Sequence, residues 1–239
     1  MVREDVVVPG LDPAHEGLRI AHLSDLHVGL LTSEHKIRRA IHRAAAERPD
    51  LTVLTGDYLC YSNKFVGLFA ELMKEIEGPA VAVLGNHDYW SDGEGARLAL
   101  ERAHIPVLRN QRTEITLKGA TLDLVGIDDA VTAQADPRRA FAGLKRGRSR
   151  IVLTHVPSLG DICASYGSSL ILAGHTHGGH VNIPKITEGI ARRLGNRYLA
   201  GFYEIGESVL YVNRGVGSSS VPFRANAPSE VALLTLRTR

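Results

Sequence analysis

The chain has 239 residues, enough for one large domain or two small ones, and we expect one domain over residues 1–239. Its formal net charge of +2 is too small to indicate a nucleic-acid-binding surface, so no specific nucleic-acid partner is expected. The two cysteines, Cys60 and Cys163, provide no disulfide framework and no C-x-x-C motif, which is typical of a reducing compartment.

No apolar run in the sequence approaches the roughly 18 residues that a membrane-spanning helix needs. The first five residues, Met-Val-Arg-Glu-Asp, contain no hydrophobic signal core. We therefore expect a cytoplasmic protein, with peripheral contact to a membrane as the alternative. The region 184–201, rich in Arg, Gly and apolar residues, is interpreted as either a mobile flap or the surface for such a contact.

The first half of the chain alternates between apolar runs and segments with helical spacing. After a short β-run at 6–8, strands are expected over 18–23, 51–54 and 80–84. They alternate with helices expected over 37–45, 65–76 and 94–103. This order predicts a largely parallel sheet with right-handed crossovers. Ligands of such sheets gather at the carboxyl ends of the strands, so the loops after the three main strands are candidates for a site.

The second half of the chain contains more short β-runs and fewer helices. Strands are expected over 114–117, 122–127, 151–154, 170–173, 209–212 and 231–236, and helices near 136–144 and 158–165. Gly206-Glu207-Ser208 is typical of a turn between two strands. This pattern predicts a second, more antiparallel sheet that packs on the first.

Residues that can bind metal ions cluster directly after five of these β-runs. In chain order the clusters are Asp25-Leu26-His27, Gly56-Asp57, Gly85-Asn86-His87-Asp88, His155 and Gly174-His175-Thr176-His177. They offer carboxylate, amide and imidazole ligands without a thiolate, a set that suits Mn, Fe, Zn or Co better than Ca or Mg. There are too many ligands for one tetrahedral ion and about the right number for two.

Two metal ions about 3.5–4 Å apart would form a clamp for in-line displacement at phosphorus. Such a pair needs a bridging carboxylate, for which Asp57 is the simplest choice. Taken singly, Asp88 can be explained as a turn former and Asn86 as a left-handed residue after Gly85. Five clusters at strand ends are harder to explain in this way, and they favour a metal site.

The order D-x-H, G-D, G-N-H-D, H and G-H-x-H, running from Asp25 to His177, resembles the signature of the calcineurin-like metallophosphoesterases. The finer resemblance, carried by stretches such as Gly126-Ile127-Asp128-Asp129, is to the bacterial YkuE/YaeI-type phosphodiesterase branch. The resemblance implies an α/β fold, a four-layer αββα sandwich with two mixed β-sheets flanked by helices. It also implies two metal ions, Mn, Fe or Zn, as cofactors.

The family pattern implies a role for each matching residue. By this resemblance one metal ion is bound by Asp25, His27, Asp57 and His177, and the other by Asp57, Asn86, His155 and His175. Asp57 is then shared between the ions. His87 is not a ligand in this pattern but faces the leaving-group oxygen as general acid or electrostatic stabiliser, and Asp88 orients it.

Substrate selection has to come from other residues, because metal ions bind phosphate in general. Tyr89 and Trp90 follow the catalytic loop and are candidates for stacking on a base or covering an acyl chain, with Trp90 as a packing residue the alternative. His180 is a candidate for contact with substrate or with the metal ligands. Arg214 and Arg224 are candidates for a fork that holds a non-reacting phosphate.

These interpretations predict a dinuclear metal-dependent phosphohydrolase acting on a phosphate ester, with phosphodiesterase as the leading hypothesis. A metal-bridging hydroxide would attack phosphorus in line while His87 assists the leaving group. One alternative is a UDP-diacylglucosamine-type lipid pyrophosphatase, because some relatives act on lipid-linked substrates, although the chain lacks a long helical cap insertion for acyl chains. Another is a non-catalytic scaffold of the same fold, which the complete set of ligand positions disfavours.

Overall fold

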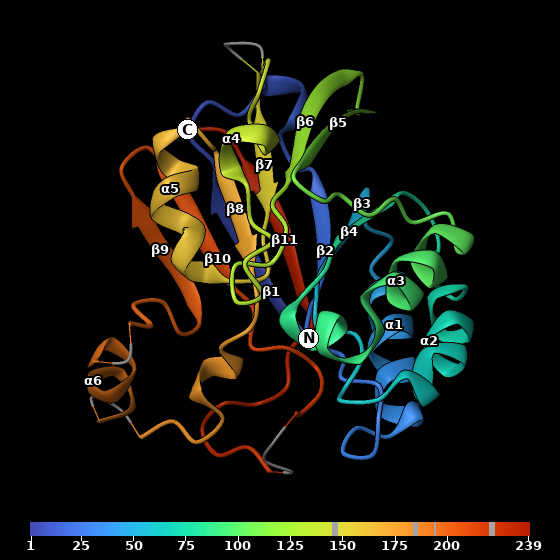
Figure 1. Ribbon diagram of the computed structural model, residues 1–239. Coiled ribbons are helices and arrows are strands. Elements are labelled where there is room, and N and C mark those ends of the chain that lie inside the picture. The colour runs from blue at the N-terminus through green and yellow to red at the C-terminus, as the bar shows by residue number, and fades with distance from the viewer. Residues whose placement is uncertain (145–147, 184–185, 194, 220–222) are drawn as a thin grey trace.

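The computed structural model describes residues 1–144, 148–183, 186–193, 195–219 and 223–239. Their strands form two sheets that face each other (Figure 1). The first sheet contains, in spatial order, β1 (Val2–Val7), β11 (Ala232–Arg237), β2 (Arg19–Leu23), β3 (Leu51–Thr55) and β4 (Ala80–Val83). The second contains β5 (Gln111–Leu117), β6 (Ala120–Gly126), β7 (Arg150–Leu153), β8 (Leu170–Ala173), β10 (Ser208–Val212) and β9 (Gly201–Ile205).

Both sheets are mixed. In the first sheet β2, β3 and β4 run parallel, and β11 pairs antiparallel with β2 and parallel with β1. In the second sheet β6, β7, β8 and β10 run parallel, while β5 and β9 are antiparallel edge strands. The parallel strands of each sheet therefore end at one edge, where the loops that follow them can meet.

Helices cover the outer faces of both sheets and complete the predicted four-layer sandwich. The first sheet is covered by α1 (Glu34–Ala46), α2 (Val66–Met73) and α3 (Asn86–Arg102), and the second by α4 (Pro137–Ala140) and α5 (Gly160–Ser165) (Figure 1). A sixth helix, α6 (Ile186–Arg193), lies away from the sheets. Within the part of the chain that the structure describes, every helix is too short or too polar to cross a bilayer.

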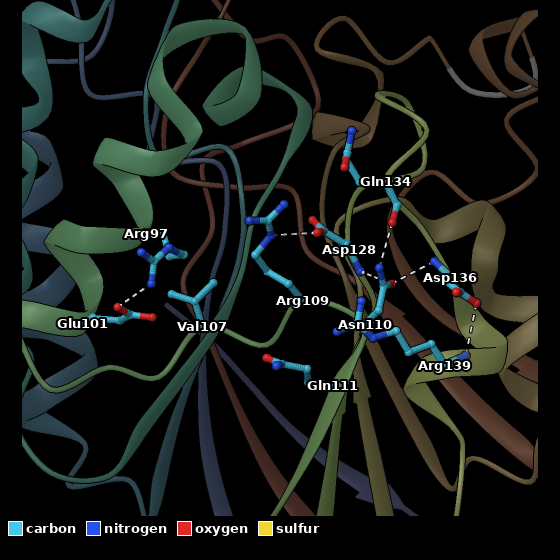
Figure 2. Close-up of a pocket in the computed structure, with 10 residues that line it drawn as sticks. All are labelled: Arg97, Glu101, Val107, Arg109, Asn110, Gln111, Asp128, Gln134, Asp136 and Arg139. Carbon is cyan, nitrogen blue, oxygen red and sulfur yellow. Dashed lines mark hydrogen bonds and ion pairs between the residues drawn. The ribbon is translucent and has the colours of Figure 1, made fainter.

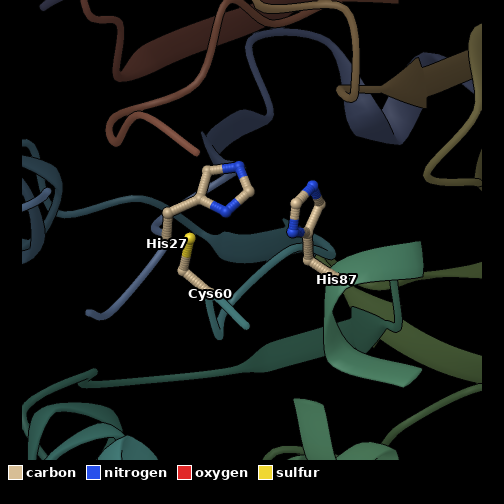
Figure 3. Close-up of side chains that lie close together, drawn as sticks. All are labelled: His27, Cys60 and His87. Carbon is tan, nitrogen blue, oxygen red and sulfur yellow. The ribbon is translucent and has the colours of Figure 1, made fainter. Parts of the chain in front are cut away.

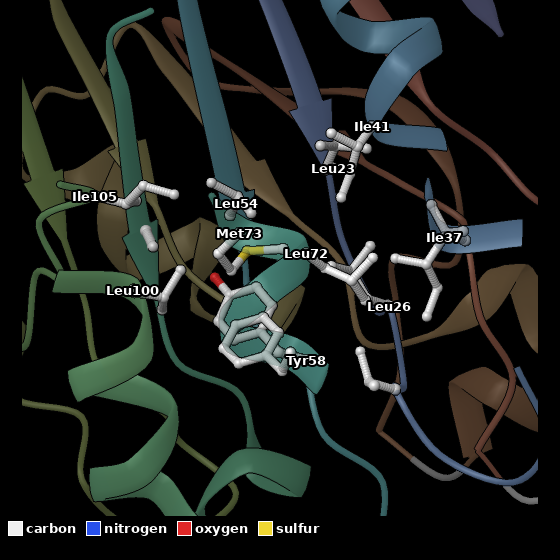
Figure 4. Close-up of a cluster of buried hydrophobic side chains, with 14 of the residues drawn as sticks. Leu23, Leu26, Ile37, Ile41, Leu54, Tyr58, Leu72, Met73, Leu100 and Ile105 are labelled. Atoms are coloured by element: carbon white, nitrogen blue, oxygen red, sulfur yellow. The ribbon is translucent and has the colours of Figure 1, made fainter. Parts of the chain in front are cut away.

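Apolar side chains fill the spaces between the layers. Leu23 and Leu54 of the first sheet pack against Ile37 of α1 and Leu72 of α2 (Figure 4). Another cluster lies between the two sheets and a third between the second sheet and its helices. All five residues of β3 are buried because both faces of this strand are covered.

Three expectations about the elements need correction. α3 begins at Asn86 rather than near Glu94, because its polar first turn, separated from the rest by a kink at Asp92, has no apolar period. β11 belongs to the first sheet, where Leu234 pairs with Ile20, a long-range pairing that no local pattern encodes. The second sheet is antiparallel only at its edges, since its central strands are parallel.

The region 184–201 is described only in part, because positions 184, 185 and 194 lie outside the described residues. Its central part is α6, on which Ile186 and Ile190 are exposed. Its roles as a flap or a membrane contact therefore stay predictions.

Candidate metal centre

The predicted ligands directly follow β2, β3, β4, β7 and β8, on loops except for Asn86, which begins α3, and His177, which begins a short 3₁₀ helix. Backbone hydrogen bonds hold neighbouring loops together: Asp25 N donates to Gly56 O over 2.9 Å, and Gly174 N donates to His155 O over 3.1 Å. His175 N donates to the two carboxylate oxygens of Asp25 at 3.1 and 3.2 Å, which joins the loops of the two sheets. The edge predicted from strand order is therefore one continuous site.

Most of the predicted ligands have a left-handed backbone conformation. The φ angle is positive, between 47° and 73°, at Asp25, His27, Asp57, His175 and His177. For a residue other than glycine this conformation costs roughly 1–2 kcal/mol. Such strain persists only where surrounding contacts hold the backbone, and it is typical of functional sites.

One set of ligands, here called the first group, consists of Asp25, His27 and His177. His27 Nε2 lies 3.0 Å from His177 Nε2, and His177 Nε2 lies 3.4 Å from Asp25 Oδ1. All three side chains are buried. Their donor atoms therefore converge on one point, as the ligands of a metal ion do.

The second group consists of Asp57, His155 and His175. His155 Nε2 lies 3.2 Å from both Asp57 Oδ2 and His175 Nδ1. His155 Nδ1 donates to Thr55 O over 2.7 Å, an arrangement that leaves Nε2 available and is usual for metal-binding histidines. Asn86, the remaining predicted ligand, is buried, and its Oδ1 has no hydrogen-bond partner among the described residues.

Burial keeps most of these imidazoles uncharged at neutral pH. It lowers the pKa of His27 to about 3 and, together with nearby His155, that of His175 to about 4. Burial alone would also lower the pKa of His155, but the Asp57 carboxylate raises it to about 10. A metal ion needs the lone pair of the neutral ring, so an ion at the second group would displace the proton between His155 and Asp57.

A pair of metal ions fits these residues. The donors are carboxylate, imidazole and one amide oxygen, a set that binds divalent transition metals. The unpartnered Asn86 Oδ1 supports the fit, because an unsatisfied buried polar atom costs about 1–3 kcal/mol that a metal ion would relieve. All seven predicted ligands follow strands whose loops meet at this edge, and six of them form the two groups.

Cys60, to which the sequence assigned no role, also lies at the site. Its sulfur is close to a ring nitrogen of His27 and one of His87, within 4.8 Å (Figure 3). Burial, with a further contribution from Asp57, raises the pKa of Cys60 to about 11, so the thiol stays protonated at neutral pH. The thiolate is the form that binds metals, so a metal ion would have to displace this proton in order to bind Cys60.

His87 lies beside the first group. Its ring is edge-on to His27, with centroids 4.8 Å apart and planes at 85°. Its Nδ1 is buried and has no hydrogen-bond partner in the described part of the chain. The backbone N of His87 donates to Asp57 Oδ1 over 2.8 Å, which ties the first turn of α3 to the loop after β3.

The expectation that Asp88 orients the His87 ring does not match the contacts of its carboxylate. Both oxygens accept backbone N–H groups, from Asp57 and Gly85 at one oxygen and from Tyr58 and Leu59 at the other, over 2.7–3.0 Å. Four such bonds fill the acceptor positions of the carboxylate. Asp88 therefore fixes the loop after β3 instead of the neighbouring imidazole.

The two arginines of the predicted phosphate fork are both engaged elsewhere. Arg214 pairs with Glu230 over 2.6 Å. Arg224 donates to the carbonyl oxygens of Arg214 and Gly217, and its Nη2 lies 2.8 Å from His177 Nδ1. These contacts hold the loop beside His177, so they give Arg224 a supporting position next to the first group.

The other predicted substrate contacts lie around the site at different depths. Tyr89 is half-buried and donates to Asp128 Oδ1 over 2.5 Å. His180 stacks on His177 with ring centroids 4.3 Å apart. Trp90 is exposed and lies 5.0 Å from the His87 ring centroid.

A chain of buried hydrogen bonds behind Asp25 was not foreseen from the sequence. Ser24 Oγ donates to Asp25 Oδ2 over 2.5 Å, Thr55 Oγ1 donates to Ser24 Oγ over 2.8 Å, and His22 Nε2 lies 2.8 Å from Thr55 Oγ1. Only glycine fits at position 174, because a Cβ there would collide with Ser24 and Asp25. Ser24, a polar residue next to Asp25 at the end of β2, is the feature of the sequence that could have indicated these hydrogen bonds.

Asp128 also lines a polar cavity of about 620 Å³ (Figure 2). Arg97 and Glu101 of α3 line one side, and Arg109 pairs with Asp128 over 2.9 Å. None of the predicted metal ligands lines this cavity, so it is separate from the metal centre.

Comparison with known proteins agrees with this geometry. Phosphodiesterase YaeI from Escherichia coli (strain K12) is 33% identical over 224 residues, covering 91% of this chain and 82% of YaeI. Metallophosphoesterase YkuE from Bacillus subtilis (strain 168) is 27% identical, covering 99% of this chain and 84% of YkuE. The 5′-nucleotidase precursor from Thermus thermophilus has a similar fold, with a TM-score of 0.57 at 16% identity over 91% of this chain and 54% of that one.

The sequence profile of the calcineurin-like phosphoesterases matches residues 18–179, a range that contains all five motif clusters. This family depends on a pair of metal ions, and the two ligand groups are present here. The chain therefore belongs to the calcineurin-like phosphoesterases, metal-dependent hydrolases of phosphoric esters.

Proposed function

We propose that the chain is a phosphodiesterase that hydrolyses its substrate at a pair of metal ions. The observation that carries this proposal is the position of Asp57 between the two ligand groups. Its Oδ2 lies 3.7 Å from His27 Nε2 of the first group and 3.2 Å from His155 Nε2 of the second. Similarity to phosphodiesterase YaeI favours a diester over a monoester as substrate.

Each ion would be held by one ligand group, with Asp57 shared and Asn86 added to the second group. The nitrogen and oxygen donors favour Mn, Fe or Zn. Two such ions, when bound, lower the pKa of a water molecule and neutralise the phosphoryl oxygens for in-line displacement at phosphorus.

His87 is the residue that we propose to assist the leaving group. Its ring lies against His27 of the first group, and its Nδ1 has no partner in the described part of the chain. Burial lowers the pKa of the His87 ring, so a proton on this ring is readily given up to the departing oxygen. General acid catalysis of this kind contributes about 10²–10⁴-fold to the rate.

The test is metal-dependent release of nitrophenol from bis-p-nitrophenyl phosphate. We expect a chelator to abolish it and Mn²⁺ to restore it. The variant Asp57→Asn should lower kcat by about 10⁴-fold, since metal ions supply several kcal/mol of transition-state stabilisation. Asp5→Asn, on an exposed carboxylate of β1, is the matched control. Full activity of Asp57→Asn would contradict the shared-metal assignment.

A lipid-linked phosphodiester is a second candidate substrate, favoured by exposed apolar side chains on the loops after β2, β3 and β8, on α3 and α6, and on the segment between β10 and β11. We call these residues the apolar rim: Leu30, Leu31, Tyr61, Trp90, Ile183, Ile186, Ile190 and Phe223. Cys60 Sγ donates to Ser219 O, and Val181 bridges to Ala225, so these loops are linked around the site. A rim of this kind would also support peripheral membrane contact.

This second candidate is tested with a phosphodiester lipid in mixed micelles. The double variant Ile186→Ser/Ile190→Ser should lower the rate with the lipid substrate at least about fivefold, because each exposed isoleucine contributes about 1 kcal/mol when it enters an apolar phase. The rate with bis-p-nitrophenyl phosphate should not change. Equal rates of the variant and the wild type with the lipid would exclude this use of the rim.

A further inference from the structure

Two aromatic side chains enclose the His87 ring on its outer side. Tyr61, from the loop after β3, lies with its ring centroid 4.6 Å from that of His87 and its plane at 71°. Trp90, in the first turn of α3, lies at 5.0 Å and 66°. The two residues follow different strands, β3 and β4. Their contact with His87 therefore depends on the fold and not on the local sequence.

Both rings are exposed, although burial of an aromatic side chain would be favourable. Tyr61 is 58% exposed and Trp90 53% exposed. Tyr61 also has a left-handed backbone, with φ of 54°, which costs roughly 1–2 kcal/mol. Exposed aromatic surface and a strained backbone beside a catalytic histidine are together typical of a binding function rather than of packing.

The position of His87 defines what these rings can meet. His27, a predicted metal ligand, contacts the His87 ring on its inner side at 4.8 Å. An oxygen that receives a proton from His87 has to lie between the metal ligands and the solvent. The group attached to that oxygen must therefore leave past Tyr61 and Trp90.

We propose that Tyr61 and Trp90 form a subsite for the leaving group, and that they select phosphodiesters whose leaving alcohol carries a planar aromatic ring, as a nucleoside does. This inference rests on the phosphodiesterase function proposed above. Stacking of a base on an aromatic side chain is worth about 1–3 kcal/mol and does not depend on a specific sequence of bases. A flexible alkyl group has no π-face to stack, so it gains less binding free energy from the two rings.

Binding can be measured without catalysis, because Trp90 is the single tryptophan of the chain. Phenylphosphonate and methylphosphonate are suitable probes, since their C–P bonds are not hydrolysed. With zinc-loaded protein, we expect phenylphosphonate to change the Trp90 fluorescence and to bind about tenfold more tightly than methylphosphonate, the equivalent of one stacked ring. Tyr61→Ala should reduce this ratio to less than about threefold, and Tyr61→Phe should retain it.

Kinetics supply the second readout, with a methyl aryl phosphate and a methyl fluoroalkyl phosphate whose leaving alcohols have matched acidity. In Tyr61→Ala and Trp90→Ala we expect kcat/KM for the aryl substrate to fall about 10–100-fold. The fluoroalkyl substrate should change by less than about threefold. Tyr166→Ala is the control, because this aromatic residue stacks on Phe141 next to the start of β7, away from the catalytic edge.

The outcomes separate this inference from the proposed function. Equal losses for both substrates in the alanine variants, or equal affinity of the wild type for both phosphonates, would overturn the aromatic subsite. Selective binding of phenylphosphonate without any metal-dependent hydrolysis would support the subsite and contradict the phosphodiesterase function alone.

Discussion

The metal-ligand residues and the apolar rim are adjacent but opposite in their physical character. The ligands are almost all buried, and hydrogen bonds to neighbouring loops hold them: the Asp25 carboxylate alone accepts Ser24 Oγ and His175 N. The rim residues are exposed, and Leu30 is 92% exposed. Buried side chains held by hydrogen bonds suit chemistry that requires exact placement of charge, whereas exposed apolar surface suits recognition of a variable substrate.

This comparison assigns reaction and selection to different residues. Changes at the ligands and their supports should affect metal binding, rate or stability. Changes at the rim should affect only the choice of substrate. The following variants test this division.

After Asp57→Asn, the largest effect is expected for His87→Ala, on the boundary between the two regions. The value of kcat should fall about 10³-fold for a diester with a poor leaving group, because a general acid contributes about 10²–10⁴-fold. The loss should be smaller with nitrophenolate, which departs without a proton. Metal content, measured by elemental analysis, should stay at the wild-type value. His42→Ala, on the exposed face of α1, is the control.

Asp88→Asn should destabilise the protein by about 2–4 kcal/mol, measured by urea unfolding. Asparagine keeps one of the two acceptor oxygens, so two of the four backbone N–H groups lose a partner inside the protein. Asp92→Asn in the same helix, where the carboxylate accepts a single bond from Gly95 N, should have a much smaller effect. Unchanged stability of Asp88→Asn, together with a changed pH profile of kcat, would instead favour a role in orienting His87.

Ser24→Ala should weaken metal binding about 10–100-fold, the usual effect of removing a hydrogen bond to a metal ligand. The serine donates to Asp25 and receives a bond from Thr55, so its loss frees the carboxylate to rotate. Competition with a chromophoric chelator measures the affinity. The exposed Ser165→Ala provides the comparison. Wild-type affinity of Ser24→Ala would show that the carboxylate needs no such support.

The smallest effect is expected at the rim. Leu30→Ser should change the free energy of unfolding by less than about 0.5 kcal/mol, as exposed substitutions do. Leu26→Ala, four residues earlier in the same loop, should cost about 2–5 kcal/mol because Leu26 is buried. The free energies of unfolding of both variants are measured by chemical denaturation. Similar losses of stability in Leu30→Ser and Leu26→Ala would show that this loop does not separate into a core part and a rim part.

The two groups of candidate metal ligands could be predicted from the sequence, because five polar clusters each follow an apolar strand. The Asp88 contacts could not, since its four partners lie on loops whose approach depends on the pairing of β3 with β4. The start of α3 could not be predicted either, because its first turn consists of polar residues of the candidate site and has no apolar face. Tyr61 was not predicted as a site residue, because nothing in the local sequence distinguishes it from other tyrosines on loops.

The chemistry is local in the sequence: the ordered ligands, the absence of a C-x-x-C motif and the strand–loop–helix order can each be recognised from short stretches of residues. The side chains that surround this chemistry are brought there by folding. Folding placed β11 in the first sheet, committed Arg214 and Arg224 to Glu230 and to backbone carbonyls, and brought Tyr61 and Trp90 to one histidine. The physical reason is that contacts between distant loops depend on sheet register and packing, which no short stretch of sequence contains.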